Sequence, residues 1–189
     1  MGLNSTPASD RIHIGFFGKR NAGKSSVINA VTDQNLSIVS EVKGTTTDPV
    51  YKAMELLPLG PVMMIDTPGF DDEGDLGQLR MQKSFQVLNK TDIAVLVADG
   101  TIGIFEEDRG ILRRFRKKNI PYIIVFNKLD LSDGSPDMQK AENILWVSST
   151  TGENIHELKE LIARQVPSGQ SKYPIVSDLI KPRDLVILV

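Results

Sequence analysis

The sequence contains no cysteine, so disulfide bonds and thiolate ligation of zinc or of an iron–sulfur cluster are excluded within these 189 residues. No apolar run is long enough to span a bilayer. The formal net charge is only -2, which gives no general basic surface for nucleic acid or for a membrane. Residues 1–10 are polar and lack the apolar core of a secretory signal, so we expect a disordered lead-in there. These absences are typical of a cytoplasmic protein.

Apolar runs alternate with helical patterns along the chain, and this alternation predicts an α/β fold. We expect a three-layer sandwich, in which helices cover both faces of a six-stranded, mainly parallel sheet. The turn Pro58-Leu59-Gly60-Pro61 joins two strands directly, so one edge strand should be antiparallel. The predicted strands are 12–17, 50–56, 62–65, 93–98, 121–126 and 144–147, and the predicted helices are 24–32, 76–90, 105–118 and 153–165.

Residues 18–25 read Gly-Lys-Arg-Asn-Ala-Gly-Lys-Ser and fit the phosphate-binding pattern of a P-loop NTPase. Gly18 and Gly23 allow a tight turn whose backbone N–H groups point at phosphate oxygens. Lys24 offers a positive charge to the β- and γ-phosphates, and the Ser25 hydroxyl suits Mg²⁺. The alternative is a plain glycine turn between a strand and a helix. Three further motifs in the expected order favour the nucleotide site.

Asp66-Thr67-Pro68-Gly69 follows the predicted strand at 62–65. An acidic residue in this position holds Mg²⁺ in nucleoside triphosphatases, usually through a water molecule. Gly69 would let a backbone N–H approach the γ-phosphate. The pattern is a common turn when it stands alone, so its place after the phosphate loop is what makes it informative.

Gly44-Thr45-Thr46-Thr47-Asp48 precedes the predicted strand at 50–56. A threonine hydroxyl in this segment can join Ser25 on Mg²⁺, and loss of its phosphate contact after hydrolysis would release the loop. Threonines are also good strand formers. The spacing alone does not decide which of the three binds the metal.

Asn127-Lys128-Leu129-Asp130 follows the predicted strand at 121–126 and predicts recognition of guanine. The Asp130 carboxylate can accept two hydrogen bonds from guanine N1–H and the exocyclic amine, a donor pair that adenine lacks. The Lys128 stem can lie over the purine ring, and Asn127 can tie this loop to the phosphate loop. An ordinary polar turn is the alternative. Backbone N–H groups at Ser148 and Ser149, after the last strand, could contact guanine O6.

Together these motifs predict a domain for GTP and GDP over residues 11–165. The residues expected to bind the nucleotide are Asn21, Ala22, Gly23, Lys24, Ser25, Ser26, Asp66, Gly69, Asn127, Lys128, Asp130, Ser148 and Ser149.

The chain resembles the translation-factor-related branch of GTPases over this range. Asn21 and Gly44-Thr45-Thr46 are similar to the potassium-dependent group of tRNA-modification and ribosome-assembly GTPases. That resemblance implies a K⁺ ion against the phosphates, held by Asn21, the carbonyls of Ser40 and Val42, and Thr45. It also implies that Thr46 joins Ser25 and Asp66 on Mg²⁺, and that the catalytic groups are Lys24, Thr46 and Gly69.

Phe70 follows Gly69 at the position where many GTPases have a glutamine that orients the attacking water. A phenylalanine cannot polarise water, so another group must act and intrinsic hydrolysis should be slow. The neighbouring acidic loop could supply a carboxylate, or it could be a solvated surface loop with no catalytic role. Its acidic residues are Asp71, Asp72, Glu73 and Asp75.

Segments 17–26, 44–50 and 66–72 resemble the GTPase subunit of the [FeFe]-hydrogenase maturation machinery. The end of the chain resembles that family's passage into its dimerisation domain, so residues 166–189 are expected to be a linker and the start of a following domain. An extra strand on the same domain is the alternative. The resemblance implies a scaffold for di-iron cluster assembly, acting as a homodimer with hydrogenase maturation proteins and the hydrogenase apoprotein. The family's cysteine-rich cluster domain is absent from this cysteine-free sequence.

Three functions are consistent with the sequence: a K⁺-stimulated, Mg²⁺-dependent GTP-hydrolysing switch, a nucleotide-gated docking module with negligible turnover, and an RNA-processing GTPase. The third needs a stronger basic surface than the sequence predicts, so a nucleic-acid partner is not expected. The single basic cluster is more simply read as the solvated face of a helix. It comprises Arg113, Arg114, Arg116, Lys117 and Lys118.

Overall fold

The computed structural model of the chain describes residues 11–32, 48–69, 75–132 and 141–166. The predicted lead-in at 1–10, most of the threonine-rich segment, the acidic loop at 71–74 and the tail beyond residue 166 lie outside these ranges.

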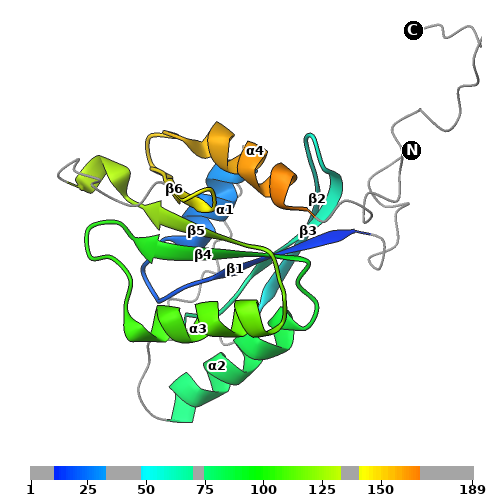
Figure 1. The fold of residues 1–189 in the computed structure, drawn as a ribbon, viewed down its shortest axis with the longest axis vertical. Coiled ribbons are helices and arrows are strands. Elements are labelled where there is room, and N and C mark those ends of the chain that lie inside the picture. The colour runs from blue at the N-terminus through cyan, green and yellow to red at the C-terminus, as the bar shows by residue number, and fades with distance from the viewer. Residues whose placement is uncertain (1–10, 33–47, 70–74, 133–140, 167–189) are drawn as a thin grey trace, which may run out of the picture.

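A six-stranded sheet forms the centre of the domain (Figure 1), as the sequence predicts. Its strands lie in the order β2-β3-β1-β4-β5-β6. All neighbouring pairs are parallel except β2 and β3, so the antiparallel strand is at an edge, as predicted. The strands are β1 (Ile12–Phe17), β2 (Val50–Leu56), β3 (Gly60–Asp66), β4 (Ile93–Asp99), β5 (Tyr122–Asn127) and β6 (Ile144–Trp146).

Helices cover both faces of this sheet, with α1 and α4 on one face and α2 and α3 on the other (Figure 1). Each face has its own apolar core, and the two cores meet in the sheet itself. Across the described ranges, no helix combines the length and apolar character needed to cross a membrane. The helices are α1 (Lys24–Val31), α2 (Asp75–Leu88), α3 (Glu106–Lys117) and α4 (Ile155–Gln165), with a 3₁₀ turn η2 (Leu129–Leu131) after β5.

The central strand β4 shows why the parallel strands appear in the sequence as continuous apolar runs. Ile93, Val95 and Val97 belong to the core under α1 and α4, whereas Ala94 and Leu96 belong to the core under α2 and α3. A parallel strand covered on both faces must be apolar at every position. The edge strand β2 instead alternates between half-buried and exposed side chains.

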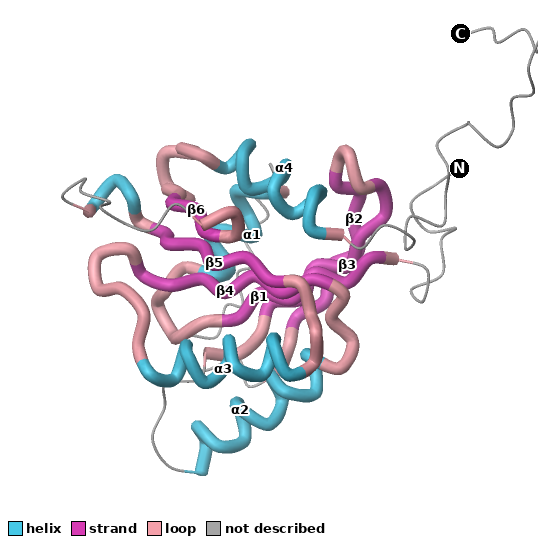
Figure 2. The backbone as a smooth tube through the Cα atoms, in the orientation of Figure 1, coloured by secondary structure: helices cyan, strands magenta, loops and turns pink. Residues whose placement is uncertain are grey.

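Polar residues collect where the parallel strands end. Because β1, β3, β4 and β5 run in the same direction, their carboxyl ends lie along one edge of the sheet. Asp66, Asp99 and Asn127 are the last residues of three of these strands. The loops that leave β1, β4 and β5 all emerge on this side (Figure 2).

Candidate functional site

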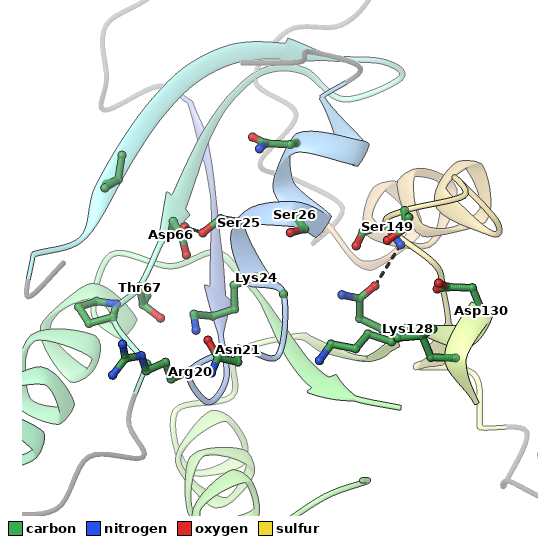
Figure 3. A pocket seen from close by; sticks show the side chains of 18 of the residues that line it. Arg20, Asn21, Lys24, Ser25, Ser26, Asp66, Thr67, Lys128, Asp130 and Ser149 are labelled. Carbon is green, nitrogen blue, oxygen red and sulfur yellow. Dashed lines mark hydrogen bonds between the residues drawn. The ribbon is translucent and has the colours of Figure 1, made fainter. Parts of the chain in front are cut away.

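An open pocket lies at this edge of the sheet, and side chains from four separate loops point into it (Figure 3). The phosphate loop after β1 forms its floor, the loop after β3 forms one wall, and the loops after β5 and β6 form the other. The lining residues from the first loop and α1 are Arg20, Asn21, Gly23, Lys24, Ser25, Ser26 and Asn29; those from the other loops include Asp66, Thr67, Gly69, Asn127, Lys128, Asp130, Ser149 and Thr150.

The phosphate loop needs its glycines for two different reasons. A side chain at Gly18 would place a Cβ 2.1 Å from the Val97 carbonyl oxygen, so the loop packs directly on β4. Gly23 has a φ of +90° and forms the N-cap of α1, where Val27 N donates to its carbonyl at 2.8 Å. The N-terminus of α1 therefore opens into the pocket, where its first N–H groups and the positive end of the helix dipole suit an anion.

Lys24 is buried beneath the loop that precedes it. Its ammonium donates to the carbonyl oxygens of Gly18 at 3.0 Å and Lys19 at 2.8 Å. These contacts hold a positive charge at the floor of the pocket, where the phosphates of a nucleotide would lie.

Ser25 and Asp66 lie side by side, and the Ser25 hydroxyl donates to Asp66 Oδ2. Burial raises the pKa of the Asp66 carboxyl above its ordinary value. The Ser25 hydrogen bond and the charges of Lys24 and Lys52 act against that rise. A bound divalent cation would favour the charged carboxylate in the same way.

These two oxygen-bearing groups fit an Mg²⁺ ion that is shared with phosphates. Mg²⁺ is commonly held by one or two protein ligands, with waters and substrate phosphates completing its shell. Among the residues that the structure describes, no group of three or more acidic or histidine side chains could hold a metal by itself. The predicted third ligand, Thr46, lies outside the described residues, as do the predicted K⁺ ligands Ser40, Val42 and Thr45.

The loop after β3 is fixed against the end of β1 and lies close to the phosphate loop. Thr67 donates to the Phe16 carbonyl from its backbone N–H at 3.2 Å and from its hydroxyl at 2.7 Å. A Cβ at Gly69 would lie 2.6 Å from the backbone nitrogen of Arg20. Only glycine permits this approach, and the contact of Gly69 with the γ-phosphate stays a prediction.

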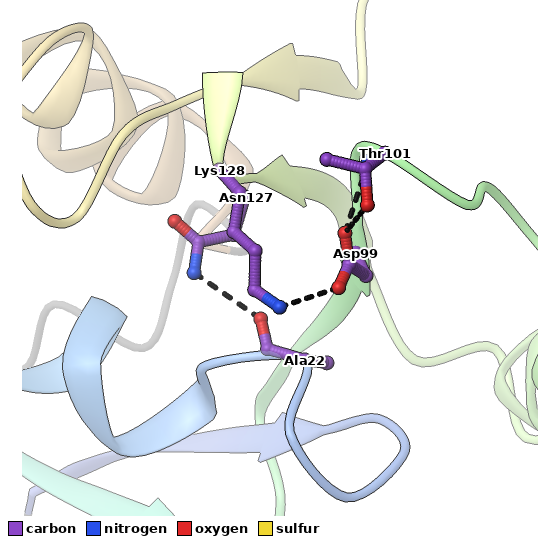
Figure 4. Close-up of polar contacts among 5 residues, drawn as sticks. All are labelled: Ala22, Asp99, Thr101, Asn127 and Lys128. Atoms are coloured by element: carbon purple, nitrogen blue, oxygen red, sulfur yellow. Dashed lines mark hydrogen bonds and ion pairs between the residues drawn. The ribbon is translucent and has the colours of Figure 1, made fainter. Parts of the chain in front are cut away.

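Asn127 ties the base loop to the phosphate loop, as expected from the sequence, and it also holds the loop after β6. Its amide Nδ2 donates to the Ala22 carbonyl in the phosphate loop at 3.1 Å (Figure 4). Its Oδ1 accepts a hydrogen bond from Ser149 N at 3.0 Å. Because the side chain is buried, these bonds fix the base loop, the phosphate loop and the loop after β6 relative to one another.

Asp130 lines the pocket and is oriented by Ser148, whose hydroxyl donates to Asp130 Oδ1 at 2.6 Å. The backbone N–H of Ser148 donates to the Glu153 carbonyl at 3.1 Å, and that of Ser149 is held by Asn127. Both N–H groups thus have partners within the protein, and their contact with guanine O6 stays a prediction. The role of the Ser148 side chain was not foreseen from the sequence.

Asp99 is a second residue that sequence reasoning missed. Its Oδ2 accepts an ion-paired hydrogen bond from Lys128 Nζ at 2.5 Å, and its Oδ1 accepts from the N–H and hydroxyl of Thr101. Burial raises the pKa of the Asp99 carboxyl, but the bonds from Lys128 and Thr101 outweigh it, and the pKa lies below its ordinary value. An acidic residue after the apolar run at 93–98 was the available signal.

Comparisons with known proteins agree with this geometry. Residues 13–128 match the 50S ribosome-binding GTPase family. The tRNA modification GTPase MnmE of Desulforamulus reducens is 31% identical over 160 residues, which is 81% of this chain and 34% of that protein. GTPase Der of Kosmotoga olearia is 35% identical over 127 residues, 65% of this chain and 28% of that protein. The chain thus spans about a third of the length of these curated relatives.

Solved structures lead to the same group. Aquifex aeolicus Era bound to GDP·AlF₄⁻ superimposes with a TM-score of 0.69 at 26% identity, covering 86% of this chain and 59% of that chain. Era in complex with MgGDPNP and a segment of 16S ribosomal RNA also gives a TM-score of 0.69, at 27% identity. The chain belongs to the 50S ribosome-binding GTPase family and contains a GTP-binding, P-loop GTPase domain.

Proposed function

We propose that this domain is a switch that hydrolyses GTP slowly, depends on Mg²⁺ and is stimulated by K⁺. The observation that carries the proposal is the pair of hydrogen bonds made by Asn127. They hold the loop that contains Asp130 beside the phosphate loop, and residues of both loops line one pocket, which supports binding of a base and a phosphate chain together. A site with fixed base and phosphate positions holds the γ-phosphate in a defined place, and positioning is most of what phosphoryl transfer requires.

The residues at the phosphate end support stabilisation of negative charge. The Lys24 ammonium and the N-terminus of α1 both face the place where the β- and γ-phosphates would lie. Mg²⁺, when bound at Ser25 and Asp66, would supply further positive charge there. The backbone at Gly69 approaches the phosphate loop closely enough for its N–H to be offered to the γ-phosphate.

Asn21 supports the proposed role of K⁺. It lines the pocket within the phosphate loop, in a left-handed conformation with a φ of 62°. An amide oxygen is a suitable ligand for a monovalent cation, and K⁺ against the phosphates would offset charge that develops during transfer. The remaining proposed ligands lie outside the described residues, so the proposal rests on the place and the chemistry of Asn21.

We propose that residues 35–49 and 68–80 change conformation with the nucleotide state. An ion pair between the end of the first segment and α2, the helix in which the second segment ends, supports coupling between them. Lys83 in α2 pairs with Asp48 at 2.5 Å, and Asp48 directly follows the threonine-rich segment. The pair is a physical link through which a change at the threonines can reach α2.

The test of this proposal is GTP hydrolysis under single-turnover conditions with Mg²⁺, in KCl and in NaCl of equal ionic strength. We expect a several-fold faster reaction in KCl, and we expect Asn21→Ala to abolish the difference. Asn119→Ala is the matched control, because Asn119 also has a positive φ (53°) but does not line the pocket. Equal wild-type rates in both salts would contradict the K⁺ role. No hydrolysis in either salt would favour the nucleotide-gated docking module.

The names of the relatives favour a process that involves RNA, because they include a tRNA modification GTPase and an Era complex with ribosomal RNA. We therefore propose a role of the tRNA-modification or ribosome-assembly type as the first candidate. The second candidate is a scaffold for [FeFe]-hydrogenase maturation, acting as a homodimer, and it is favoured by the sequence of segments 17–26, 44–50 and 66–72. For the first candidate, two arginines on the basic face of α3 already have partners within the domain. Arg113 pairs with Glu106, and Arg114 lies over the Phe85 ring.

Replacing the gene in its host with one encoding the Lys24→Ala variant would separate the two processes. The first candidate predicts altered tRNA modification or ribosome assembly with hydrogenase activity intact. The second predicts the loss of active hydrogenase with normal RNA. Hydrogenase activity that persists in the variant would rule out the second candidate, since Lys24 is central to phosphate binding.

A further inference from the structure

Asp99 lies directly behind the base-binding loop. It is the last residue of β4, and its parallel partner in β5 is Asn127. The N–H of Gly100 also donates to the Asn127 carbonyl at 2.7 Å, so the end of β4 is bonded to the start of the base loop. Lys128, the next residue, lines the pocket, whereas Asp99 does not.

The carboxylate of Asp99 is held by its own turn. Thr101 donates to Oδ1 from its N–H at 2.9 Å and from its hydroxyl at 2.7 Å. The Asp99 carbonyl accepts a bond from Gly103 N at 2.8 Å, which closes the turn. The carboxylate therefore stays in place without Lys128, and its second oxygen can anchor a cation (Figure 4).

This anchor decides where the Lys128 side chain runs. Lys128 has a left-handed backbone, with a φ of 68°, and its ammonium is 2.5 Å from Asp99 Oδ2. With both ends fixed, the methylene stem lies along the wall of the pocket near Asp130 (Figure 3). A lysine side chain loses rotamer entropy when it is ordered, and here much of that loss occurs before any ligand arrives.

We propose that Asp99 is a positioning residue for the purine ring: it fixes the Lys128 ammonium so that the lysine stem is a ready-made apolar surface for the base. The inference rests on the guanine site described above and assigns different roles in base binding to Asp130 and Asp99. Asp130 would select guanine among purines through hydrogen bonds, whereas Asp99, acting through Lys128, would support any purine and have no effect on the phosphate chain.

A purely structural role would be to hold β4 and β5 together. The two strands already pair along six residues of each, from Ala94 with Tyr122 to Asp99 with Asn127. The register of the two strands is therefore fixed without the Asp99–Lys128 bond. It leads away from the sheet and into the pocket wall, which favours the role in binding.

A double-mutant cycle on the full chain tests the proposal. The affinity for GDP is measured by calorimetry for the wild type, Asp99→Asn, Lys128→Ala and the double variant. We expect each single substitution to weaken GDP binding about tenfold, and the double variant to bind no more weakly than Lys128→Ala. We also expect Asp99→Asn to lower the affinity for IDP, whose base lacks the exocyclic amine, by the same factor as the affinity for GDP. The affinity for inorganic triphosphate should not change.

Asp92→Asn is the matched control, since Asp92 precedes the other end of β4 and accepts a bond from His13 N at 2.8 Å. It should lower thermal stability without lowering GDP affinity. If Asp99→Asn does not fold, Thr101→Val is the alternative, because it removes the hydroxyl that donates to Asp99 Oδ1. Thr101→Val should also lower GDP affinity, by a smaller factor.

Two results would overturn the proposal. One is that Asp99→Asn lowers GDP affinity by the same factor in the Lys128→Ala background as in the wild type. The other is that Asp99→Asn lowers the affinities for inorganic triphosphate and for GDP by the same factor. Failure of the wild type itself to bind GDP would instead contradict the guanine site on which the inference rests.

Discussion

At Gly23 the phosphate loop lies close against Asn127 of the base loop. A Cβ there would lie 2.2 Å from Asn127 Nδ2, the atom that donates to the Ala22 carbonyl. We predict that Gly23→Ala lowers GDP affinity strongly, because the methyl group displaces the Asn127 amide. It should also lower the free energy of unfolding by about 1–2 kcal/mol through its left-handed φ of +90°. Calorimetry and chemical denaturation measure the two effects.

Gly60→Ala separates the two causes. Gly60 has a similar φ of +81°, but a Cβ there meets nothing within 4 Å, and it lies at the opposite end of β3 from Asp66. The control should lose a similar amount of stability and keep its GDP affinity. If Gly23→Ala keeps full affinity as well, the Asn127 bridge does not matter for binding.

Single residues also mark how far sequence reasoning reaches. Asn127 was expected to tie its loop to the phosphate loop, because an amide has both a donor and an acceptor and the motif order places the two loops together. The part played by Asp99 was not predicted, since its partner Lys128 is 29 residues away and only the pairing of β4 with β5 brings them together.

At the scale of elements, every strand and long helix within the described residues was predicted, and the differences lie at their ends. β3 begins at Gly60 rather than 62, because its antiparallel pairing with β2 continues to Leu56 opposite Gly60. α2 ends at Leu88 rather than 90, where the N–H of Lys90 bonds back only three residues to Val87. Such ends depend on hydrogen bonds to neighbours, which periodicity does not reveal.

The position of the site could be predicted from the pattern of the parallel strands. Parallel strands are apolar along their whole length, so the first polar residues mark their carboxyl ends. The motifs at Asp66 and Asn127 both follow such runs. The sequence does not decide which residue orients the attacking water, because several neighbouring carboxylates follow Phe70. Residues 70–74 lie outside the described residues, and Asp75 is the first residue of α2.

At the scale of the whole molecule, the fold accounts for guanine nucleotide binding, while the process served is a matter for proposal. The chain corresponds to about a third of the length of the MnmE relatives, and the similarity covers the domain that such proteins share. The same pocket would serve RNA modification, ribosome assembly or metal-cluster assembly equally well. The experiments in the host are therefore needed to choose among them.

The central claim is that the loops after β1, β3, β5 and β6 build a guanine nucleotide pocket. Its most direct test is the affinity of the chain for GDP and for ADP, measured by calorimetry with Mg²⁺. Because Asp130 is held in the pocket by Ser148 and offers only acceptors to the base, we predict that GDP binds at least about 10³-fold more tightly than ADP. Similar affinities for the two nucleotides would contradict the account.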